Sequence, residues 1–386
     1  MTREIYLDNS ATTRPYEEVI SYMNDINLNY YGNPSSLHKK GIEAERLIKK
    51  SRDIIAKTLS ADSSEIIFTS GGTESNNLAI RGFLQANPRA GKHVITTPIE
   101  HPSVLEVYKY LSNTGFQVDY LDIDQKGAVD IEGLRNKITE QTSLLSIILV
   151  NNETGSIQDI EKIINVKNSV NPKTVLHVDA VQAYGKMLIS PAKWGIDIMS
   201  MSSHKIHGPK GVGALYVNKS IRIKPILFGG GQESEIRSGT ENVAGICGFG
   251  MAAELSFNSM EANYIKVKNL RDKFVELLSD SGVEHNIISP EDSLPYILNV
   301  SFTHVKSEVL LHHLEEKNIF VSTGSACSSR KAKHSHVLKA MGIKSCDIEG
   351  AIRFSFSVHN TEQDIFDTVE ALKEIIPRIK IRRGGK

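Results

Sequence analysis

The chain has few cysteines, no net charge and no long apolar run. Its three cysteines, Cys247, Cys327 and Cys346, are too few and too scattered for a disulfide framework or a CxxC zinc site, so we expect reduced thiols and no metal. Basic and acidic residues balance at 45 each, so no overall field would draw the chain to nucleic acid. No stretch approaches the roughly 20 apolar residues that span a bilayer, and MTREIYLDNS lacks the apolar run of a signal peptide. We therefore expect a cytoplasmic protein that binds neither membranes nor nucleic acid directly.

Short β-rich runs alternate with longer helical stretches through most of the chain, which is typical of parallel strands joined by crossover helices. The predicted strands are SEIIFTS, KHVITT, FQVDYLD, SLLSIILV, TVLHVDA, DIMSMS and GALYV. One long helical stretch, residues 243–280, then leads into a second pattern with strands near YILNVSF and AIRFSFS. The sequence predicts an α/β fold with a mostly parallel sheet in a large domain, residues 14–256. A smaller α+β domain would combine residues 1–13 and 257–386.

A lysine and an aspartate form a candidate cofactor site. Lys205 lies in SSHKIHGPKG and Asp179 lies in HVDAVQ. Pyridoxal phosphate is held as an imine by a lysine, and its ring nitrogen stays protonated only beside a fixed carboxylate. Burial away from water would lower the pKa of an imine-forming lysine, and so would neighbouring cations such as His204 and Lys210. The two segments therefore predict a site for pyridoxal 5'-phosphate.

Glycine-rich turns follow predicted strands and could approach a ligand closely. Gly71, Gly72 and Thr73 follow SEIIFTS and open a predicted helix, where backbone amides can hold a phosphate. An N-cap threonine is also an ordinary structural choice, so the turn fits either use. The three glycines of GPKGVG, residues 208–213, match neither a dinucleotide fingerprint nor a P-loop. We expect these three to allow close backbone packing.

An ordered series of motifs makes the chain resemble cysteine desulfurases of the NifS/IscS type. The motifs are LDNSATT, GNPSSLHKKG, FTSGGTESNN, EHPSV, VNNETG, HVDAVQAYGK, SSHKIHGPKG, GGGQESEIRSGTENV and TGSACSS. They begin at residue 7, and the resemblance extends to about residue 357, so it covers nearly the whole chain. It implies the aspartate-aminotransferase-like fold (fold type I) of class V pyridoxal-phosphate enzymes and a homodimer with active sites near the subunit interface. The implied reaction removes sulfur from L-cysteine, leaves L-alanine and passes the sulfur to an acceptor.

The resemblance also implies roles for single residues. Lys205 would be the imine lysine and Asp179 the partner of the ring nitrogen. His101 would stack on the ring and help to move protons, although a histidine before a proline is more often a helix-entry residue. The remaining implied contacts are Gly72, Thr73, Ser202 and His204 at the phosphate, Asn152 and Gln182 at the phenolic oxygen or the substrate, and Thr240, otherwise a helix N-cap, at the phosphate of the other subunit.

Substrate capture and sulfur transfer are implied to depend on an arginine and a cysteine. Arg353 in GAIRFSFS would bind the α-carboxylate of the substrate, because a guanidinium pairs with a carboxylate through two hydrogen bonds. Cys327 is followed by a basic loop, residues 328–336, whose field favours the thiolate. That thiolate would attack the substrate sulfur and form a persulfide. We expect Cys247 and Cys346, in contrast, to be buried as small apolar residues.

Several alternatives stay open at the level of sequence. A selenocysteine lyase or another class V aminotransferase-type enzyme would keep Lys205 and Asp179, and a catalytically silent binding subunit is a third possibility. The histidines and cysteines between residues 312 and 346 lack CxxC or HExxH spacing, which disfavours zinc. The loop after Cys327 is Arg-Lys-Ala-Lys-His where many relatives have small residues, an acidic residue and proline. The acceptor could therefore be an iron–sulfur scaffold or a tRNA-thiolation enzyme.

Overall fold

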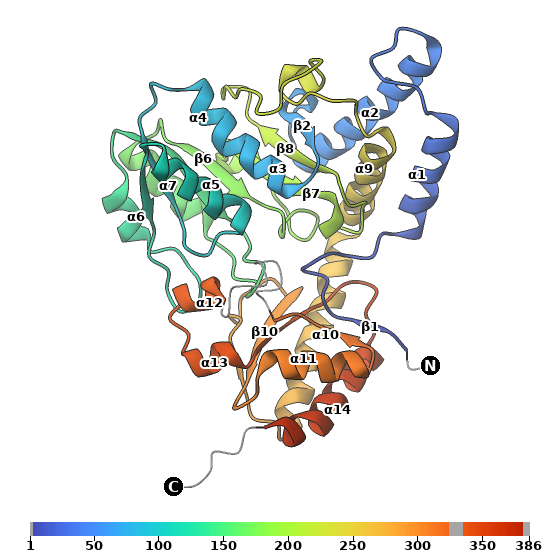
Figure 1. Cartoon of the computed structure of the whole chain (residues 1–386), viewed down its shortest axis with the longest axis vertical. Helices are drawn as coiled ribbons and strands as arrows, with labels where there is room; N and C mark the ends of the chain where they lie inside the picture. The colour runs from blue at the N-terminus through green and yellow to red at the C-terminus, as the bar shows by residue number, and fades with distance from the viewer. Residues whose placement is uncertain (1–2, 324–334, 381–386) are drawn as a thin grey trace.

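A large sheet forms the upper part of the molecule in a computed structural model that describes residues 3–323 and 335–380 (Figure 1). Its seven strands follow the order β2-β8-β7-β6-β5-β3-β4. Their bounds are β2 (Ile66–Thr69), β3 (His93–Thr96), β4 (Gln117–Tyr120), β5 (Thr142–Ile148), β6 (Val175–Asp179), β7 (Ile198–Ser202) and β8 (Gly213–Val217). β8 is antiparallel to both neighbours and the other pairs are parallel. The seven strands predicted for this part and its mostly parallel character are confirmed.

Helices cover both faces of the large sheet, and for this reason its central strands are buried along their whole length. Leu144 of β5 packs with Val104 and Phe83 on one face, whereas the next residue, Leu145, packs with Ile163 on the other. The helices of this part are α1 (Glu17–Asn29), α2 (Lys39–Thr58), α3 (Gly72–Asn77), α4 (Phe83–Ala86), α5 (Pro102–Asn113), α6 (Ile131–Lys137), α7 (Ile160–Val170) and α8 (Pro191–Trp194). The short 3₁₀ turns η1 (Ser63–Glu65), η3 (Ser203–Lys205) and η4 (Glu233–Glu235) complete it, together with η2 (Leu78–Gly82), a π-helical segment between α3 and α4.

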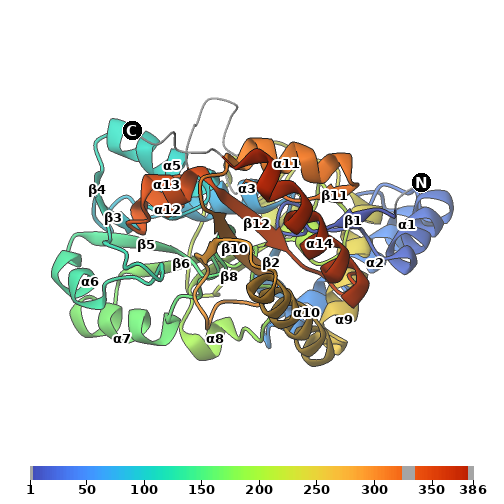
Figure 2. The ribbon, with the colours of Figure 1, turned by 90° about the horizontal axis from the view of Figure 1, so that it is seen from below.

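The lower part contains a small antiparallel sheet in the order β12-β10-β9, with helices packed beside it (Figure 2). Its strands are β9 (His285–Ile287), β10 (Ile297–Phe302) and β12 (Ala351–Ser355), and β1 (Ile5–Tyr6) pairs separately with β11 (Ile319–Phe320). The helices are α10 (Met260–Asp280), α11 (Ser307–Glu316), α12 (His336–Ala340), α13 (Ser345–Glu349) and α14 (Glu362–Ile379). The strands predicted near YILNVSF and AIRFSFS are therefore present.

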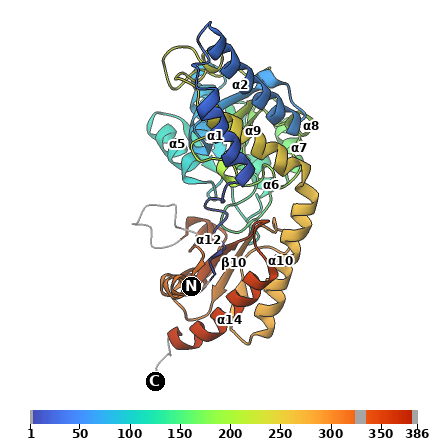
Figure 3. The same ribbon diagram turned by 90° about the vertical axis from the view of Figure 1, so that its right-hand side faces the viewer.

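The predicted helical stretch 243–280 is two helices rather than one. α9 (Val243–Asn258) ends and α10 begins at Ser259, whose φ of −109° and ψ of 8° are not helical. α9 packs against α1 and α2 in the upper part, and α10 packs against α14 in the lower part (Figure 3). The predicted domain boundary at 256–257 falls in the last turn of α9, and we keep the division into domains as a proposal. Within the described ranges, no helix has both the length and the apolar sequence that a bilayer crossing requires.

The N-terminal segment, residues 7–13, joins the two parts. The amide of Leu7 donates to the carbonyl of Phe320 beside the small sheet. The amide of Ser10 donates to Oγ of Ser355 in β12. The amide of Thr13 then donates to the carbonyl of His204, which follows β7 of the large sheet. Residues from both ends of the chain therefore meet at the carboxyl edge of the large sheet.

Candidate functional site

The candidate site lies at the carboxyl edge of the large sheet, where loops after several parallel strands converge. Asp179 is the last residue of β6 and Ser202 the last of β7. The other predicted residues on these loops are Gly72 and Thr73 after β2, His101 after β3, Asn152 after β5, Gln182 after β6, and His204 and Lys205 after β7. Five loops that are far apart in the sequence are thus brought to one edge, because strands that run in the same direction end on the same side of the sheet.

Lys205 is buried at this edge, with 8% of its surface exposed. It ends the short turn η3, which follows β7 directly. Its Nζ donates to the carbonyls of Ser10 and Ala11 in the N-terminal segment. The amine is therefore held at the junction of the two parts by two backbone oxygens.

A polar chain connects Asp179 to His101. Nδ2 of Asn76 donates to Oδ2 of Asp179 at 2.7 Å and to Oγ of Ser103 at 2.8 Å. Oγ of Ser103 in turn lies 2.8 Å from Nδ1 of His101, and the backbone amide of Val181 donates to Oδ1 of Asp179. Both carboxylate oxygens of Asp179 are thus fixed by donors. Sequence reasoning missed Asn76, although it lies in the quoted motif FTSGGTESNN.

His101 is the N-cap of α5, as the ordinary interpretation of a histidine before a proline expected. Its Nδ1 accepts a hydrogen bond from the amide of Ser103 at 3.1 Å. Burial lowers the pKa of His101, and Lys205 lowers it further while Asp179 opposes the shift. The ring is therefore neutral at pH 7 and its Nδ1 is used as an acceptor. This cap fixes the orientation of the imidazole at the edge of the site.

The turn after β2 brings backbone amides into the site. Gly71 has φ +148°, which a side chain would strain, and α3 begins at the next residue. A Cβ on Gly72 would lie 2.8 Å from Cγ2 of Val181, so the glycine allows this close approach. Thr73, in the first turn of α3, is exposed. The turn can present amide donors to an anion.

Two hydroxyls without partners lie where β7 ends and η3 begins. Oγ of Ser202 and Oγ of Ser203 are buried and have no hydrogen-bond partner among the described residues. The position of a Cβ on Gly71 would be 3.9 Å from Oγ of Ser202, so the two segments adjoin. Nδ1 of His204 lies 3.2 Å from Oγ1 of Thr12, and burial, with help from Lys205, lowers the pKa of His204 to about 3. Buried donors without partners are the groups that a phosphate would satisfy.

Arg353 reaches the site from β12 of the small sheet. Its side chain is 2% exposed, and its Nη2 lies 2.8 Å from Oδ1 of Asp8. Its Nη1 donates to the carbonyl of Asn152 at 2.9 Å, and its Nε has no partner among the described residues. Oγ of Ser10 donates to the same carbonyl of Asn152. A buried guanidinium with donor capacity to spare is suited to bind a carboxylate.

Gln182 connects the site to a buried lysine that sequence reasoning did not select. Nε2 of Gln182 donates to the carbonyl of Ser10 at 2.9 Å, and Oε1 accepts from Nζ of Lys186 at 3.2 Å. Lys186 is 6% exposed and lies four residues after Gln182 in HVDAVQAYGK. The four-residue spacing between Gln182 and Lys186 in that motif was the signal from which their contact could have been predicted.

Two of the three glycines in GPKGVG serve close packing as predicted, and the third does not. A Cβ on Gly208 would lie 2.1 Å from Oγ of Ser203, and one on Gly213 would lie 2.6 Å from Cα of Gly71. Gly211 has open space around it, so that part of the prediction is wrong. Its φ of +77° is the reason for glycine at this position.

The cysteines differ in environment. Cys247 is buried in α9, as predicted, and burial raises the pKa of its thiol. Cys346 was also predicted to be buried, but it is exposed. It lies in α13, a five-residue helix that has no buried residue, so the correction follows from the weak packing of that helix. Cys327 lies outside the described residues.

The described residues that flank Cys327 are attached at the site. On one side, the backbone of Ser322 exchanges hydrogen bonds with that of Arg353. On the other, Oγ of Ser335 donates to Oε2 of Glu153 at 2.5 Å, and Nε2 of His336 lies 3.0 Å from the carbonyl of Glu100. The segment that carries Cys327 therefore leaves and rejoins the described structure beside the candidate site.

Thr240 lies apart from the other predicted residues. It is exposed and belongs to the segment between η4 and α9, where Asn242 is the N-cap of α9. It lines a surface hollow with Thr69, Gly211 and Arg237. Across residues 3–323 and 335–380, no three histidine, cysteine or acidic side chains are placed to hold a metal ion.

Comparison with known proteins gives similarity over nearly the whole chain. The profile of the family described as aminotransferase class-V matches residues 5–367. A cysteine desulfurase IscS of Dictyoglomus turgidum is 41% identical over 381 residues, which cover 98% of this chain and 96% of that protein. A solved structure of a NifS-like protein has a TM-score of 0.92 at 40% identity and covers 97% of this chain and 100% of its own. A structure of SspA in complex with cysteine has a TM-score of 0.81 at 33% identity and covers 92% and 100%.

Proposed function

Because the chain belongs to the class-V aminotransferase family and is a cysteine desulfurase within it, we propose that it uses pyridoxal 5'-phosphate to move the sulfur of L-cysteine onto Cys327. The relatives that support this proposal match both parts of the molecule, not only the large sheet. The observation that carries it is that Lys205 and Arg353 meet the N-terminal segment at one buried junction, while Asp179 ends the strand beside β7. An amine, a fixed carboxylate and a spare guanidinium are the three groups that the chemistry needs.

The residues present fit pyridoxal 5'-phosphate. The buried hydroxyl of Ser202 lacks a partner among the described residues and adjoins the turn of Gly71 and Gly72, which supports phosphate binding there together with Thr73 and His204. Asp179, held by two donors, would keep the ring nitrogen protonated. When bound, this cofactor supplies an electron sink for the α-carbon of an amino acid.

The side chains around the cofactor would divide the remaining work. Lys205 would hold the aldehyde carbon and, once released by the substrate, carry the α-proton at its Nζ. His101 would lie against the ring with its orientation fixed by Ser103. Asn152 and Gln182 would contact the phenolic oxygen or the substrate. Arg353 would bind the carboxylate of the substrate. The similar structure of SspA in complex with cysteine supports an amino acid as that substrate.

The sulfur-transfer step conserves atoms and charge. The bond between Cβ and sulfur of L-cysteine breaks, a bond between that sulfur and Sγ of Cys327 forms, and Cβ gains a proton to give L-alanine. One cysteine and one enzyme thiol thus become alanine and one enzyme persulfide, with no external oxidant. The backbone hydrogen bonds between Ser322 and Arg353 support Cys327 as the attacking group. Cys327 follows Ser322 by five residues, and Ser322 is anchored beside the arginine that would bind the substrate carboxylate.

We further propose a homodimer in which Thr240 reaches the cofactor of the other subunit. Thr240 is exposed, although its motif resembles a cofactor contact. The apolar side chains of Leu37 and Phe228 are 95% and 85% exposed, which supports a covering subunit. The sulfur acceptor, an iron–sulfur scaffold or a tRNA-thiolation enzyme, and the cytoplasmic location stay predictions that transfer assays and cell fractionation test.

Replacing Cys327 by alanine tests the proposed function. Sulfide release from L-cysteine in the presence of a thiol reductant should fall by at least about 100-fold, because the nucleophile is lost. The colour of bound pyridoxal 5'-phosphate should persist, since Cys327 does not hold it. Replacing the exposed Cys346 by alanine is the matched control and should leave turnover unchanged. Undiminished sulfide release by the Cys327 variant, or selenocysteine cleavage alone, would favour the lyase alternative.

A further inference from the structure

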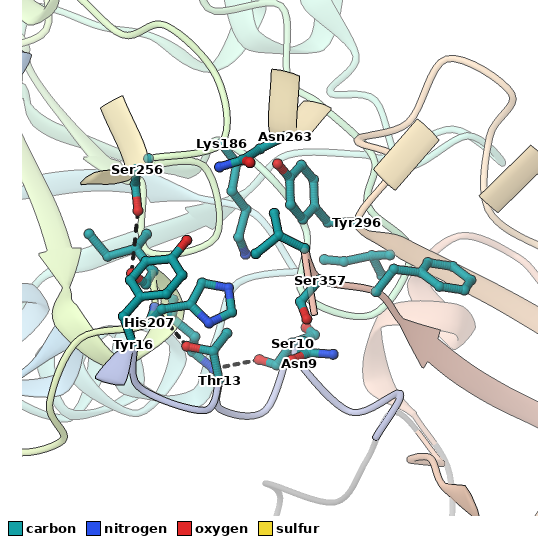
Figure 4. A pocket seen from close by; sticks show the side chains of 16 residues that line it. Asn9, Ser10, Thr13, Tyr16, Lys186, His207, Ser256, Asn263, Tyr296 and Ser357 are labelled. Atoms are coloured by element: carbon teal, nitrogen blue, oxygen red, sulfur yellow. Dashed lines mark hydrogen bonds between the residues drawn. The ribbon is translucent and has the colours of Figure 1, made fainter. Parts of the chain in front are cut away.

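Lys186 projects into a cavity between the two parts of the molecule (Figure 4), and Lys205 lines the same cavity. Both lysines line this cavity, and Tyr296 and Ser357 contribute from the lower part. The space inside it that the centre of a water molecule can occupy is about 20 Å³, so it admits about one water. Nζ of Lys186 lies 5.5 Å from the centre of the Tyr296 ring. The ammonium is thus enclosed and stabilised by an aromatic face.

A hydrogen-bonded series connects Lys186 with Lys205. Lys186 donates to Oε1 of Gln182, Nε2 of Gln182 donates to the carbonyl of Ser10, and that carbonyl also accepts from Lys205. Because protonated Lys186 is a donor only, it fixes which end of the Gln182 amide faces Ser10. Without it, the amide could turn and place its oxygen against the carbonyl of Ser10.

The charges around Lys186 are of one sign. Among the described residues no carboxylate forms an ion pair with it, and the charged groups that act on it are Lys205 and Arg353. The other titratable groups facing it are Tyr16, Tyr296, His204 and His207. Burial lowers the pKa of His207 to about 4, so both histidines are neutral at pH 7.

Burial of Lys186 is costly, and a purely structural lysine would be expected to have a carboxylate partner. Burial, followed by the charges of Lys205 and Arg353, lowers the pKa of Lys186 to about 7. The same repulsion acts in reverse on Lys205, because the interaction between two charges is mutual. A cation that is retained at this position therefore shifts the proton affinity of its neighbour.

We propose that Lys186 is a positioning residue of the reaction, which orients the amide of Gln182 and, in its protonated form, makes Lys205 release its proton more readily because its positive charge lies in the same cavity. This inference rests on the proposed role of Lys205. It assigns to HVDAVQAYGK a second function besides the cofactor contacts of Asp179 and Gln182.

Spectroscopy of the holoenzyme tests the proposal. The visible absorbance of bound pyridoxal 5'-phosphate changes when the nitrogen that joins it to Lys205 loses its proton, so its pH titration reports that proton. In Lys186→Met, the midpoint of the titration should rise by about one unit. Lys186→Gln, which can keep a hydrogen bond to Gln182 but carries no charge, should show a similar rise, and Lys186→Arg should restore the wild-type midpoint.

A second buried lysine provides the control. Lys167 in α7 is 4% exposed, and its Nζ donates to the carbonyl of Thr174 at 2.9 Å. Lys167→Met should lower thermal stability and leave the midpoint unchanged. Equal midpoints for wild type, Lys186→Met and Lys186→Gln would overturn the proposal. A wild-type protein that takes up no coloured cofactor would instead overturn the proposed function, so the two failures are distinguishable.

Discussion

Arg353 and Asp8 form an ion pair across the junction of β12 and the N-terminal segment, with Nη2 and Oδ1 2.8 Å apart. The arginine side chain is almost fully buried, whereas the aspartate side chain is 21% exposed. The pair holds the guanidinium in place before a substrate arrives. A substrate carboxylate would add to this arrangement at Nε, which has no partner in the part of the chain that the structure describes.

Replacing Arg353 by lysine should raise KM for L-cysteine roughly 10- to 100-fold while changing kcat less, because lysine keeps the charge but loses the planar fork. Steady-state sulfide release measures both constants. Arg271 in α10 is a matched control, since it is also buried but donates to the carbonyls of Pro290 and Ser293. Arg271→Lys should affect stability alone. An unchanged KM in Arg353→Lys would remove the proposed carboxylate contact.

Asp179→Asn should reduce kcat by at least about 100-fold and leave the protein folded, because asparagine cannot keep a ring nitrogen protonated. Turnover and cofactor absorbance measure the two effects. Asp197→Asn is the control, because this carboxylate lies at the opposite end of β7 and accepts from the amide of Leu176. If Asp179→Asn turned over at the wild-type rate, the assignment of Asp179 to the ring nitrogen would be wrong.

Glu100 should make stability depend on pH. Burial raises the pKa of Glu100 to about 8, although Thr97 and the amide of Ile148 oppose the shift. Since the folded pKa exceeds the unfolded value of about 4.3, the contribution is full below that value and is lost as pH rises through about 8. The loss of unfolding free energy should be on the order of a few kcal/mol.

Urea unfolding at pH 5 and pH 9 measures this dependence. Glu100→Gln, which cannot ionise, should show a smaller difference between the two pH values than the wild type. Glu106→Gln, on the exposed face of α5, should behave like the wild type. Identical pH dependence in Glu100→Gln and the wild type would show that Glu100 is ionised in the folded protein.

Phe228→Glu should weaken the proposed homodimer by more than about tenfold, because a charge would replace an apolar side chain that is 85% exposed in the single chain. Light scattering after size-exclusion chromatography measures the mass at several concentrations. Phe366→Glu is the control, since this residue is 48% exposed on α14 in the lower part of the molecule. A fully dimeric Phe228→Glu protein would place the interface elsewhere.

The strands and the edge at which the candidate residues gather could be predicted, because both follow from local patterns. Alternation of β-rich and helical runs gave the large sheet, and Asp179 and Ser202 end strands that the patterns located. The break at Ser259 was missed, since residues on both sides favour helix and only packing against different parts separates α9 from α10.

Contacts between distant segments could not be predicted from such patterns. Asp8 is paired with Arg353 and Ser10 with Lys205 across most of the chain, and no local periodicity relates them. Asn76 and Lys186 lie inside quoted motifs, but an amide or a lysine there also fits an exposed surface. Their roles follow only from burial and from the groups they face.

The N-terminal segment imposes an order on biosynthesis. Ser10 donates its amide to Ser355, 345 positions later, and accepts from Lys205. β12 is made after every strand of the large sheet, so the site lacks the contact between Ser10 and Ser355 until residue 355 has been added. Chains that stop before residue 350 should therefore bind no coloured cofactor.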